Sequence, residues 1–322
     1  MLRSVLIALL AVCATPLTAE TWPSRPLTMV VPFATGGPMD TVARILQAAL
    51  SDALHEQVIV ENVGGAGGMI GSLRVAKSAP DGYQFVLGNV GTHAVSQTLY
   101  KTPFYSSTAD FAPVVLVAEL ALVMVARKDF PANNLQEFMA YAKANQKTMQ
   151  FASAGAGSAT HLGCALINAR IGINVTHVPY RGGALAMQDL IAGRVDYLCI
   201  DTPTALPHIE SGAIKPIAIL SHGRSPSLPN LASAHEQGLT DFEASNWSAF
   251  FLPKDTPALI VQRLHDASVA AMNDPAVQKR FKENSIDLVS DERRSSAYLF
   301  QFVTSEIAKW ASPIKSSGWV LE

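Results

Sequence analysis

The chain has 322 residues, of which 49% are hydrophobic and 16% charged, with a formal net charge of −2. This apolar share suffices for packed cores and excludes an intrinsically disordered chain, and the lack of a basic excess argues against a nucleic-acid-binding protein. The length exceeds that of an average single domain, so we expect two lobes.

The N-terminus has the pattern of an export signal. Arg3 gives a positive start, residues 5–14 are apolar, and Leu17-Thr18-Ala19 ends in a small residue. We therefore expect a signal peptide over residues 1–19, cleaved after Ala19, and a mature protein outside the cytoplasm. A membrane anchor is disfavoured because the apolar run is shorter than the ~20 residues that a span needs. Cys13 leaves lipid attachment as a minor alternative, disfavoured because Val12 replaces the small residue expected before such a cysteine.

The first third of the chain alternates between short β-rich runs and helical patterns. The sequence predicts strands over residues 27–31, 58–61 and 84–87. Gly37 as N-cap and Pro38 at the first helical position predict that the first strand is followed by a helix over 38–54. Further helices are expected over 69–77 and from about Thr92. This β-α order is typical of a parallel sheet covered by helices.

The middle of the chain begins with an apolar stretch over residues 113–125 that contains one acid, Glu119. We interpret it as two strands, with a crossing between lobes near residues 119–121. Asn134 with Glu137 three positions later predicts a helix start of the capping-box type. The alternation then resumes, with strands at 175–179, 195–200 and 214–220. Between and after them we expect one helix that ends at about residue 169, a second over 184–191 and a third that begins at Thr202-Pro203.

The polar stretch 221–230 is interpreted as the return crossing. A strand over 245–252 follows, then helices opened by Thr256-Pro257 and Asp274-Pro275 and a closing helix over 291–310. Lobe 1 would then comprise residues 22–120 and 224–322, and lobe 2 residues 121–223. Two crossings side by side make a hinge, which in such proteins allows closure around a ligand.

Two strand-like runs, one in each expected lobe, lead into glycine-rich loops that open helices. These are residues 29–40 and 149–161. Such a loop leaves backbone N–H groups free at the positive end of a helix dipole, which favours an anion. The pair predicts a small carboxylate held between two lobes. The alternatives are that each loop is only a tight turn and that Ser158 is only a helix cap. We expect Asp40 to pair with Arg44 at i+4 rather than to contact a ligand.

Other candidate residues lie where predicted strands end, which is where ligands bind in open α/β sheets. They are Thr92-His93, Tyr180-Arg181 and Asp201-Thr202. Arg181 is either a cation for the carboxylate or a solvated loop residue. The glycine-rich stretch 62–68 lacks the spacing of a P-loop or a dinucleotide fingerprint. We expect either that its backbone lies close to a small ligand or that it forms only a flexible turn. A serine hydrolase is disfavoured because Phe151 occupies the first glycine position of the G-x-S-x-G motif.

Cleavage would leave two cysteines, Cys164 and Cys199. An oxidising compartment permits a disulfide, but we favour two buried thiols, because a fold of this size needs no covalent cross-link. His161 and Cys164 have a spacing compatible with a metal, yet no second pair of ligands follows at a suitable spacing. We therefore predict neither a metal nor a cofactor.

A series of ordered motifs covers nearly the whole mature chain. In chain order the motifs are Val31-Pro32-Phe33-Ala34-x-Gly36-Gly37-x-x-Asp40-x-x-Ala43-Arg44, Val60-Glu61-Asn62, Gly65-Ala66-Gly67-Gly68-x-Ile70-Gly71, Ala79-Pro80-Asp81-Gly82-Tyr83, Gly157-Ser158-x-x-His161-Leu162, His177-Val178-Pro179-Tyr180-x-Gly182 and Asp189-Leu190-x-x-Gly193-x-Val195-Asp196. With these motifs the chain resembles the substrate-binding proteins of tripartite tricarboxylate transporters, the Bug family.

The resemblance implies a two-lobed periplasmic-binding-protein fold (type II-like), in which each lobe is a mixed, mostly parallel sheet flanked by helices. It implies a periplasmic receptor that closes on a small organic carboxylate and delivers it to membrane permease subunits. Ligand contacts would come from the two glycine loops, and ligand selection from neighbouring loops. The candidate ligand-binding residues are Phe33, Ala34, Thr35, Gly37, Gly65, Ala66, Asn89, Thr92, His93, Gly155, Ala156, Ser158, Thr160, Tyr180, Arg181, Asp201 and Thr202.

Two departures from the family pattern leave the identity of the ligand open. Val63 replaces a common Arg or Lys, and Arg181 replaces a common Lys or other polar residue. We expect a monomer that binds no nucleic acid. The rival functions are an exported receptor that serves a signalling system instead of a permease, and an exported hydrolase.

Overall fold

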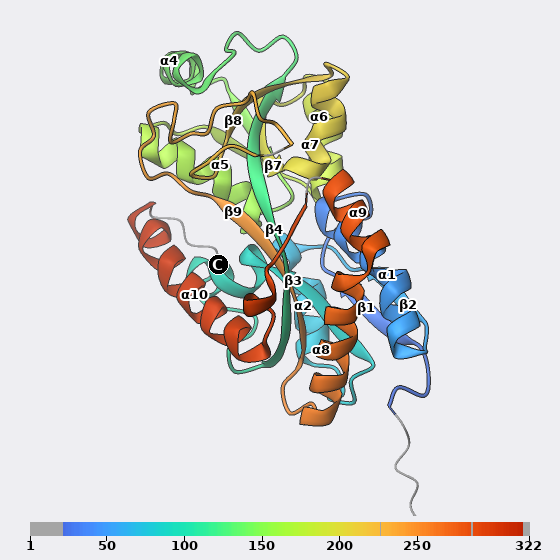
Figure 1. Cartoon of the computed structure of the whole chain (residues 1–322). Coiled ribbons are helices and arrows are strands. Elements are labelled where there is room, and N and C mark those ends of the chain that lie inside the picture. The colour runs from blue at the N-terminus through green and yellow to red at the C-terminus, as the bar shows by residue number, and fades with distance from the viewer. Residues whose placement is uncertain (1–21, 226, 285, 318–322) are drawn as a thin grey trace, which may run out of the picture.

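The computed structural model describes residues 22–317, apart from residues 226 and 285. The expected signal peptide over residues 1–19, with Cys13, lies outside these residues. Figure 1 shows two lobes joined by the long strand β4 (Phe111–Arg127), which runs through both. None of the described helices is both long and apolar enough to cross a lipid bilayer.

Lobe 1 is built on a sheet in the order β2-β1-β3-β9-β4, to which the short β10 adds beside β4. The strands β1, β2 and β3 are parallel, and β9 is antiparallel to both β3 and β4. The strands other than β4 are β1 (Leu27–Val31), β2 (Val58–Asn62), β3 (Gln84–Asn89), β9 (Ser245–Pro253) and β10 (Asp287–Leu288). The helices are α1 (Pro38–Leu54), η1 (Ala66–Gly68), α2 (Met69–Ala76), the π-helical turn η2 (Gly91–Val95), α3 (Ser96–Leu99), α8 (Ala258–Asn273), α9 (Pro275–Glu283), η3 (Asp291–Arg293) and α10 (Ser296–Ser317).

Lobe 2 continues the same sheet in the order β4-β7-β5-β6, with β8 also paired to β4. Here β5 is parallel to β6 and β7, whereas β4 is antiparallel to β7 and β8. The strands are β5 (Gln150–Ser153), β6 (Thr176–Pro179), β7 (Tyr197–Asp201) and β8 (Ile214–Ile219). The helices are α4 (Leu135–Asn145), α5 (Ala159–Ile171), α6 (Gly183–Ile191) and α7 (Thr202–Glu210).

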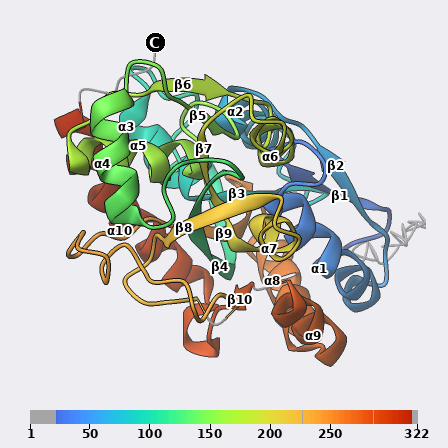
Figure 2. The same cartoon turned by 90° about the horizontal axis from the view of Figure 1, so that it is seen from above.

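Helices cover both faces of the sheet. Figure 2, seen from above, shows α4, α5 and α10 on one side and α1, α7 and α8 on the other. On the first side, one apolar core extends through both lobes and includes Leu162 of α5, Phe138 of α4 and Leu299 of α10. The opposite face is divided between two apolar cores, one in each lobe. The mixed α/β, two-lobed class expected from the sequence is confirmed.

The apolar stretch that we interpreted as two strands is a single strand, so that prediction is wrong. β4 pairs with β9 as far as Ala121 and with β7 from Leu122 onward, and so passes from one lobe to the other without a break. Glu119 does not interrupt it, because both carboxylate oxygens accept hydrogen bonds from the Arg293 guanidinium, at 2.8 and 2.7 Å. An acid paired in this way is compatible with an otherwise buried strand.

The chain after β8 stays beside lobe 2 for longer than the expected crossing at residues 221–230. Ala234 N–H donates to the carbonyl of Ile219, and Ala244 N–H donates to the carbonyl of Leu220. The chain reaches the lobe 1 sheet only at Ser245, the first residue of β9. We therefore propose a lobe boundary near residue 244.

Local helix signals are confirmed, with one exception. Gly37 caps α1 with Pro38 following, Asn134 and Glu137 form the expected cap of α4, and Asp274 caps α9. Thr256, however, is not the N-cap of α8, which is Pro257. The Thr256 hydroxyl donates instead to the carbonyl of Pro253, closing the turn before the helix.

Cys164 of α5 and Cys199 of β7 form a disulfide, so the prediction of two buried thiols is wrong. Helix α5 packs directly on β7 and brings the two Cα atoms to 5.3 Å, which is within the range that a disulfide spans. A core large enough to be stable without a cross-link does not prevent a disulfide between cysteines that packing brings this close. Because Cys164 is bonded to Cys199, it cannot serve with His161 as a metal ligand.

Candidate functional site

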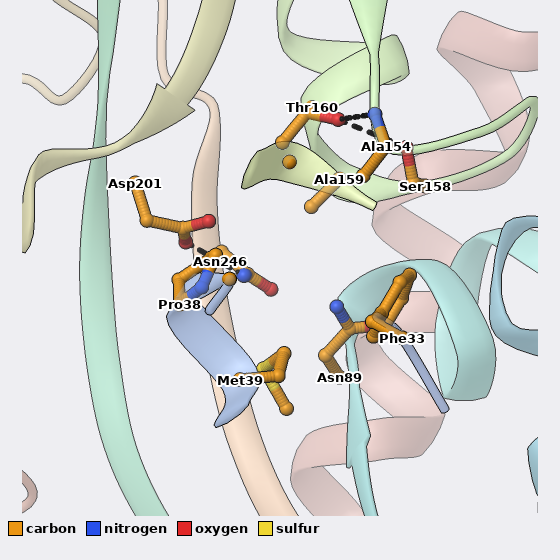
Figure 3. A pocket seen from close by; sticks show the side chains of 12 residues that line it. Phe33, Pro38, Met39, Asn89, Ala154, Ser158, Ala159, Thr160, Asp201 and Asn246 are labelled. Carbon is orange, nitrogen blue, oxygen red and sulfur yellow. Dashed lines mark hydrogen bonds between the residues drawn. The ribbon is translucent and has the colours of Figure 1, made fainter. Parts of the chain in front are cut away.

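A cavity lies between the lobes, at the ends of strands that come from both of them (Figure 3). About 330 Å³ of space there is free of atoms, and part of it is open to solvent. Its lining comes from α1, β3, the start of α5, α6, the end of β7 and the start of β9. The lining residues are Phe33, Gly37, Pro38, Met39, Asn89, Ala154, Ser158, Ala159, Thr160, Gly183, Asp201 and Asn246.

Four helix N-termini meet at this cavity. Gly37 caps α1, Ser158 caps α5, Gly183 is the first residue of α6, and Asp201 caps α7. The first N–H groups of a helix have no acceptor within it and carry the positive end of the helix dipole. Among the described lining residues there is no Lys, Arg or His. The groups of this described lining that favour an anion are therefore main-chain donors and not cationic side chains.

The glycine loop of lobe 1 is held by Asp40, which lies behind the cavity wall. Its carboxylate accepts hydrogen bonds from Gly36 N–H at 2.9 Å, Asn62 Nδ2 at 3.0 Å and Arg44 Nε at 2.9 Å. Burial opposes ionisation, but these bonds, led by that of Arg44, keep the pKa of Asp40 below its usual value. The predicted pairing of Asp40 with Arg44 is confirmed.

The glycine loop of lobe 2 is held by its own hydroxyl groups. Ser158 Oγ donates to the carbonyl of Gly155 at 2.6 Å and accepts from His161 N–H at 3.3 Å. Thr160 Oγ1 accepts from Ala154 N–H at 2.7 Å and lies 3.0 Å from Ser158 Oγ. Both hydroxyls therefore shape the loop. The N–H groups of Ala159 and Thr160, at the first two helical positions of α5, have no acceptor within the helix.

Asp201 and Asn246 form the polar side of the cavity. Asn246 Nδ2 donates to Asp201 Oδ1 at 2.7 Å, and each side chain is 1% exposed. Burial raises the pKa of Asp201 to about 7, although the bond from Asn246 favours the ionised form. Figure 3 shows the second carboxyl oxygen turned toward the cavity.

The family model of the "Tripartite tricarboxylate transporter family receptor" matches residues 42–319. The chain belongs to this receptor family. BugT from Bordetella pertussis is 35% identical over 309 residues, which are 95% of this chain and 93% of BugT. The structure of the periplasmic binding protein BugD is 38% identical with a TM-score of 0.90, covering 94% of this chain and 100% of BugD.

Two further solved structures hold carboxylates. MatC from Rhodopseudomonas palustris, with bound malate, is 36% identical with a TM-score of 0.89, over 91% of this chain and 100% of MatC. Rpa4515 from R. palustris, with adipate, is 30% identical with a TM-score of 0.87, over 93% of this chain and 99% of that protein. The family model thus describes receptors, and BugD is a periplasmic binding protein.

The structure of this receptor brings six of the candidate residues into the cavity lining: Phe33, Gly37, Asn89, Ser158, Thr160 and Asp201. Thr92 supports one of them, because its N–H donates to Asn89 Oδ1 at 3.0 Å. His93 lies behind, fully buried and stacked on Phe251 at 3.9 Å between ring centroids, and burial lowers its pKa to about 3.

Other candidates take part in contacts away from the cavity lining. Arg181 is exposed, and its carbonyl accepts from Ala34 N–H at 3.3 Å, joining the two lobes. Thr35 Oγ1 donates to Asn62 Oδ1, and Tyr180 Oη donates to Asp189 Oδ2 at 2.6 Å. Thr202 Oγ1 donates to the carbonyl of Ala121 in β4.

The remaining candidates, Gly65, Ala66, Gly155 and Ala156, belong to loops that bring the lobes together. A Cβ added at Gly155 would lie 3.2 Å from Gly67 Cα, and one added at Gly67 would lie 2.1 Å from the carbonyl oxygen of Ala156. The main chains of the two lobes are therefore in direct contact beside the cavity. Glycine is needed at Gly67 because any side chain would force the loops apart.

Sequence reasoning missed the other lining residues, Pro38, Met39, Ala154, Ala159, Gly183 and Asn246. Pro38 and Ala159 directly follow the predicted N-caps Gly37 and Ser158, and Met39 comes next after Pro38, so all three could have been inferred from helix geometry. Asn246 carries no such signal. It is the second residue of a strand that follows a long loop, and it reaches the cavity only because β9 lies beside β4.

Proposed function

We propose that this receptor captures a small organic carboxylate between its lobes and delivers it to the membrane permease subunits of a tripartite transporter. The observation that carries the proposal is the meeting of four helix N-termini at one cavity whose described lining has no cationic side chain. Main-chain donors fixed in this way suit an anion, and burial strengthens each hydrogen bond to it. The malate of MatC and the adipate of Rpa4515 make dicarboxylates the first ligands to test.

The test is thermal stability and calorimetric titration with malate, adipate, succinate and a monocarboxylate. Their amides serve as controls that keep the shape and remove the charge. A ligand at a hundred times its Kd should stabilise the protein by about 2.7 kcal/mol, and the amides should give no shift. Equal binding of acid and amide, or binding of no acid in the panel, would reject the proposal.

We propose binding without catalysis. Ser153 Oγ lies 2.6 Å from His177 Nε2, a contact that a hydrolase would use. However, Ser153 is fully buried, accepts a hydrogen bond from Gly155 N–H and is not part of the cavity lining. These features support a structural role for the pair. Hydrolysis of an ester panel by the purified protein would contradict this view.

We further propose that the receptor is exported with its signal peptide removed after Ala19 and acts as a monomer. The protein found in the periplasm should then begin at Glu20, which mass spectrometry of the intact protein would show. Delivery to a permease rather than to a signalling protein is supported by family membership.

A further inference from the structure

We propose that Asp201 takes up one proton from solvent when a carboxylate binds and donates it as a hydrogen bond to the ligand, so that capture is coupled to proton uptake. The inference rests on the proposed function, because it describes the chemistry of the same cavity. It predicts a pH dependence of affinity that main-chain donors alone would not produce.

The side chain of Asp201 is not used to cap its helix. An aspartate at the N-cap usually accepts a hydrogen bond from the N–H of the second or third helical residue. Here Asp201 makes no side-chain cap bond, and the second helical residue of α7 is Pro203, which has no N–H to offer. The carboxyl group is instead directed across the lobe junction to Asn246 and the cavity.

Asn246 can satisfy only one oxygen of this carboxyl group. Its own Oδ1 accepts from Trp247 N–H at 3.0 Å, which fixes the amide so that Nδ2 faces Asp201 Oδ1. The other Asp201 oxygen is turned toward the cavity, and the backbone N–H of Asp201 itself also donates to the carboxyl group. An ionised carboxylate there would repel the ligand carboxylate, whereas a protonated one would donate to it.

The surroundings of Asp201 favour its protonated form. Burial raises the pKa of the free carboxyl group to about 7, and a second anion in the same cavity would raise that pKa further. The charged groups of the surrounding elements have other partners. Asp40 of α1 pairs with Arg44, and in β4 Glu119 pairs with Arg293 and Arg127 pairs with Asp129 and Asp196. Asp189 of α6 contacts Tyr180 and Arg194, Lys215 of β8 donates to the carbonyl of Phe130, and His161 of α5 is stacked on His177, while His208 and Glu210 lie in the last turn of α7.

The alternative is that Asp201 stays ionised and accepts a hydrogen bond from a hydroxyl or ammonium group of the ligand. The two readings differ in measurable ways. Proton uptake predicts binding of plain dicarboxylates such as succinate and adipate, which carry no such donor. An ionised Asp201 predicts a strong preference for malate over succinate and no uptake of protons.

The experiment is calorimetric titration of malate, succinate and adipate at pH 8, in two buffers that differ in ionisation enthalpy. The wild-type protein should take up about 0.9 proton per ligand, because a carboxyl group with a pKa of about 7 is about nine-tenths ionised at this pH. Its affinity should fall by up to tenfold for each pH unit above 7. This measurement needs no variant, so it stands even if a substitution disturbs folding.

Asp201→Asn is the sharpest variant, because its amide can accept from Asn246 and donate to the ligand, as protonated Asp201 would. It should bind without proton uptake, with a flat pH profile and with higher affinity than wild type at pH 8. Asp189→Asn, which removes a charge bonded to Tyr180 and Arg194 outside the cavity lining, should keep the wild-type uptake.

Binding without proton uptake by the wild type, or loss of affinity in Asp201→Asn at pH 8, would overturn the role of Asp201 while leaving the receptor function intact. If none of the carboxylates binds to the wild type, the proposed function fails, and the role of Asp201 fails with it.

Discussion

At the scale of single residues, the hydroxyl groups of the second glycine loop line the cavity and also hold the loop in place. Ser158 closes the loop onto Gly155 and caps α5, and Thr160 holds the N–H of Ala154. These bonds fix the direction of the free N–H groups at the start of α5. The two readings that the sequence left open for Ser158, helix cap and binding residue, are thus compatible.

Replacing Ser158 by alanine should reduce both stability and ligand affinity. Loss of an N-cap costs about 1 kcal/mol of unfolding free energy, and a loosened loop no longer holds its donors in place. Asn134→Ala is the matched control, because it removes the cap of α4, which contributes no residue to the cavity lining. Denaturant titration should show a similar loss in both variants, and calorimetry should show weaker binding in Ser158→Ala alone. Equal affinities in the two variants would contradict this role.

At the scale of elements, the disulfide joins two elements that both end in the cavity. Helix α5 begins there with Ala159, and strand β7 ends there with Asp201. Cys164 and Cys199 link them from within the apolar core that extends through both lobes, where both cysteines are fully buried. The bridge thereby keeps the helix dipole of α5 and the carboxyl group of Asp201 in a constant relative position.

The double variant Cys164→Ala/Cys199→Ala should unfold at a lower denaturant concentration than the oxidised wild type. Closing a loop across a sequence separation of 35 residues restricts the unfolded chain, and native disulfides of this kind contribute about 2–4 kcal/mol. A reducing agent should lower the midpoint of the wild type and leave that of the double variant unchanged. A double variant as stable as the oxidised protein would show that the bridge contributes little.

At the scale of the whole molecule, the glycines between the lobes allow the main chains to meet. Gly91 in lobe 1 is an example, because a Cβ there would lie 2.9 Å from the carbonyl oxygen of Gly157 and 3.1 Å from Ala159 N, both in lobe 2. The φ angle of Gly91 is not in the left-handed region, so an alanine fits the backbone of lobe 1 itself. A methyl group at this position would therefore oppose closure specifically.

Gly91→Ala should lower carboxylate affinity by about tenfold or more, because ligand binding must then overcome a clash that exists only when the lobes meet. Small-angle X-ray scattering with and without malate should show a smaller ligand-induced decrease in the radius of gyration than in the wild type. Gly223→Ala is the control, because a Cβ at Gly223 has no neighbour within 4 Å. Compaction and affinity equal to those of the wild type would mean that Gly91 has no part in closure.

The order of the elements and the starting points of most helices can be predicted from local sequence patterns alone. Gly37-Pro38, Ser158, Asn134 with Glu137, and Asp274-Pro275 all act through residues within a few positions of each other, so a local pattern contains the whole interaction. Family membership, and the two glycine loops as the places to look, also followed from ordered motifs along the chain.

The path of β4, the pairing of the cysteines and the set of side chains that share the cavity become evident only in the folded chain. Each of these depends on residues far apart in the sequence, such as Asp201 and Asn246, or Glu119 and Arg293. The burial of such side chains and their hydrogen-bond partners depend on the path of the whole chain. The residues next to them in the sequence do not indicate a partner that is distant in the sequence and comes close only on folding.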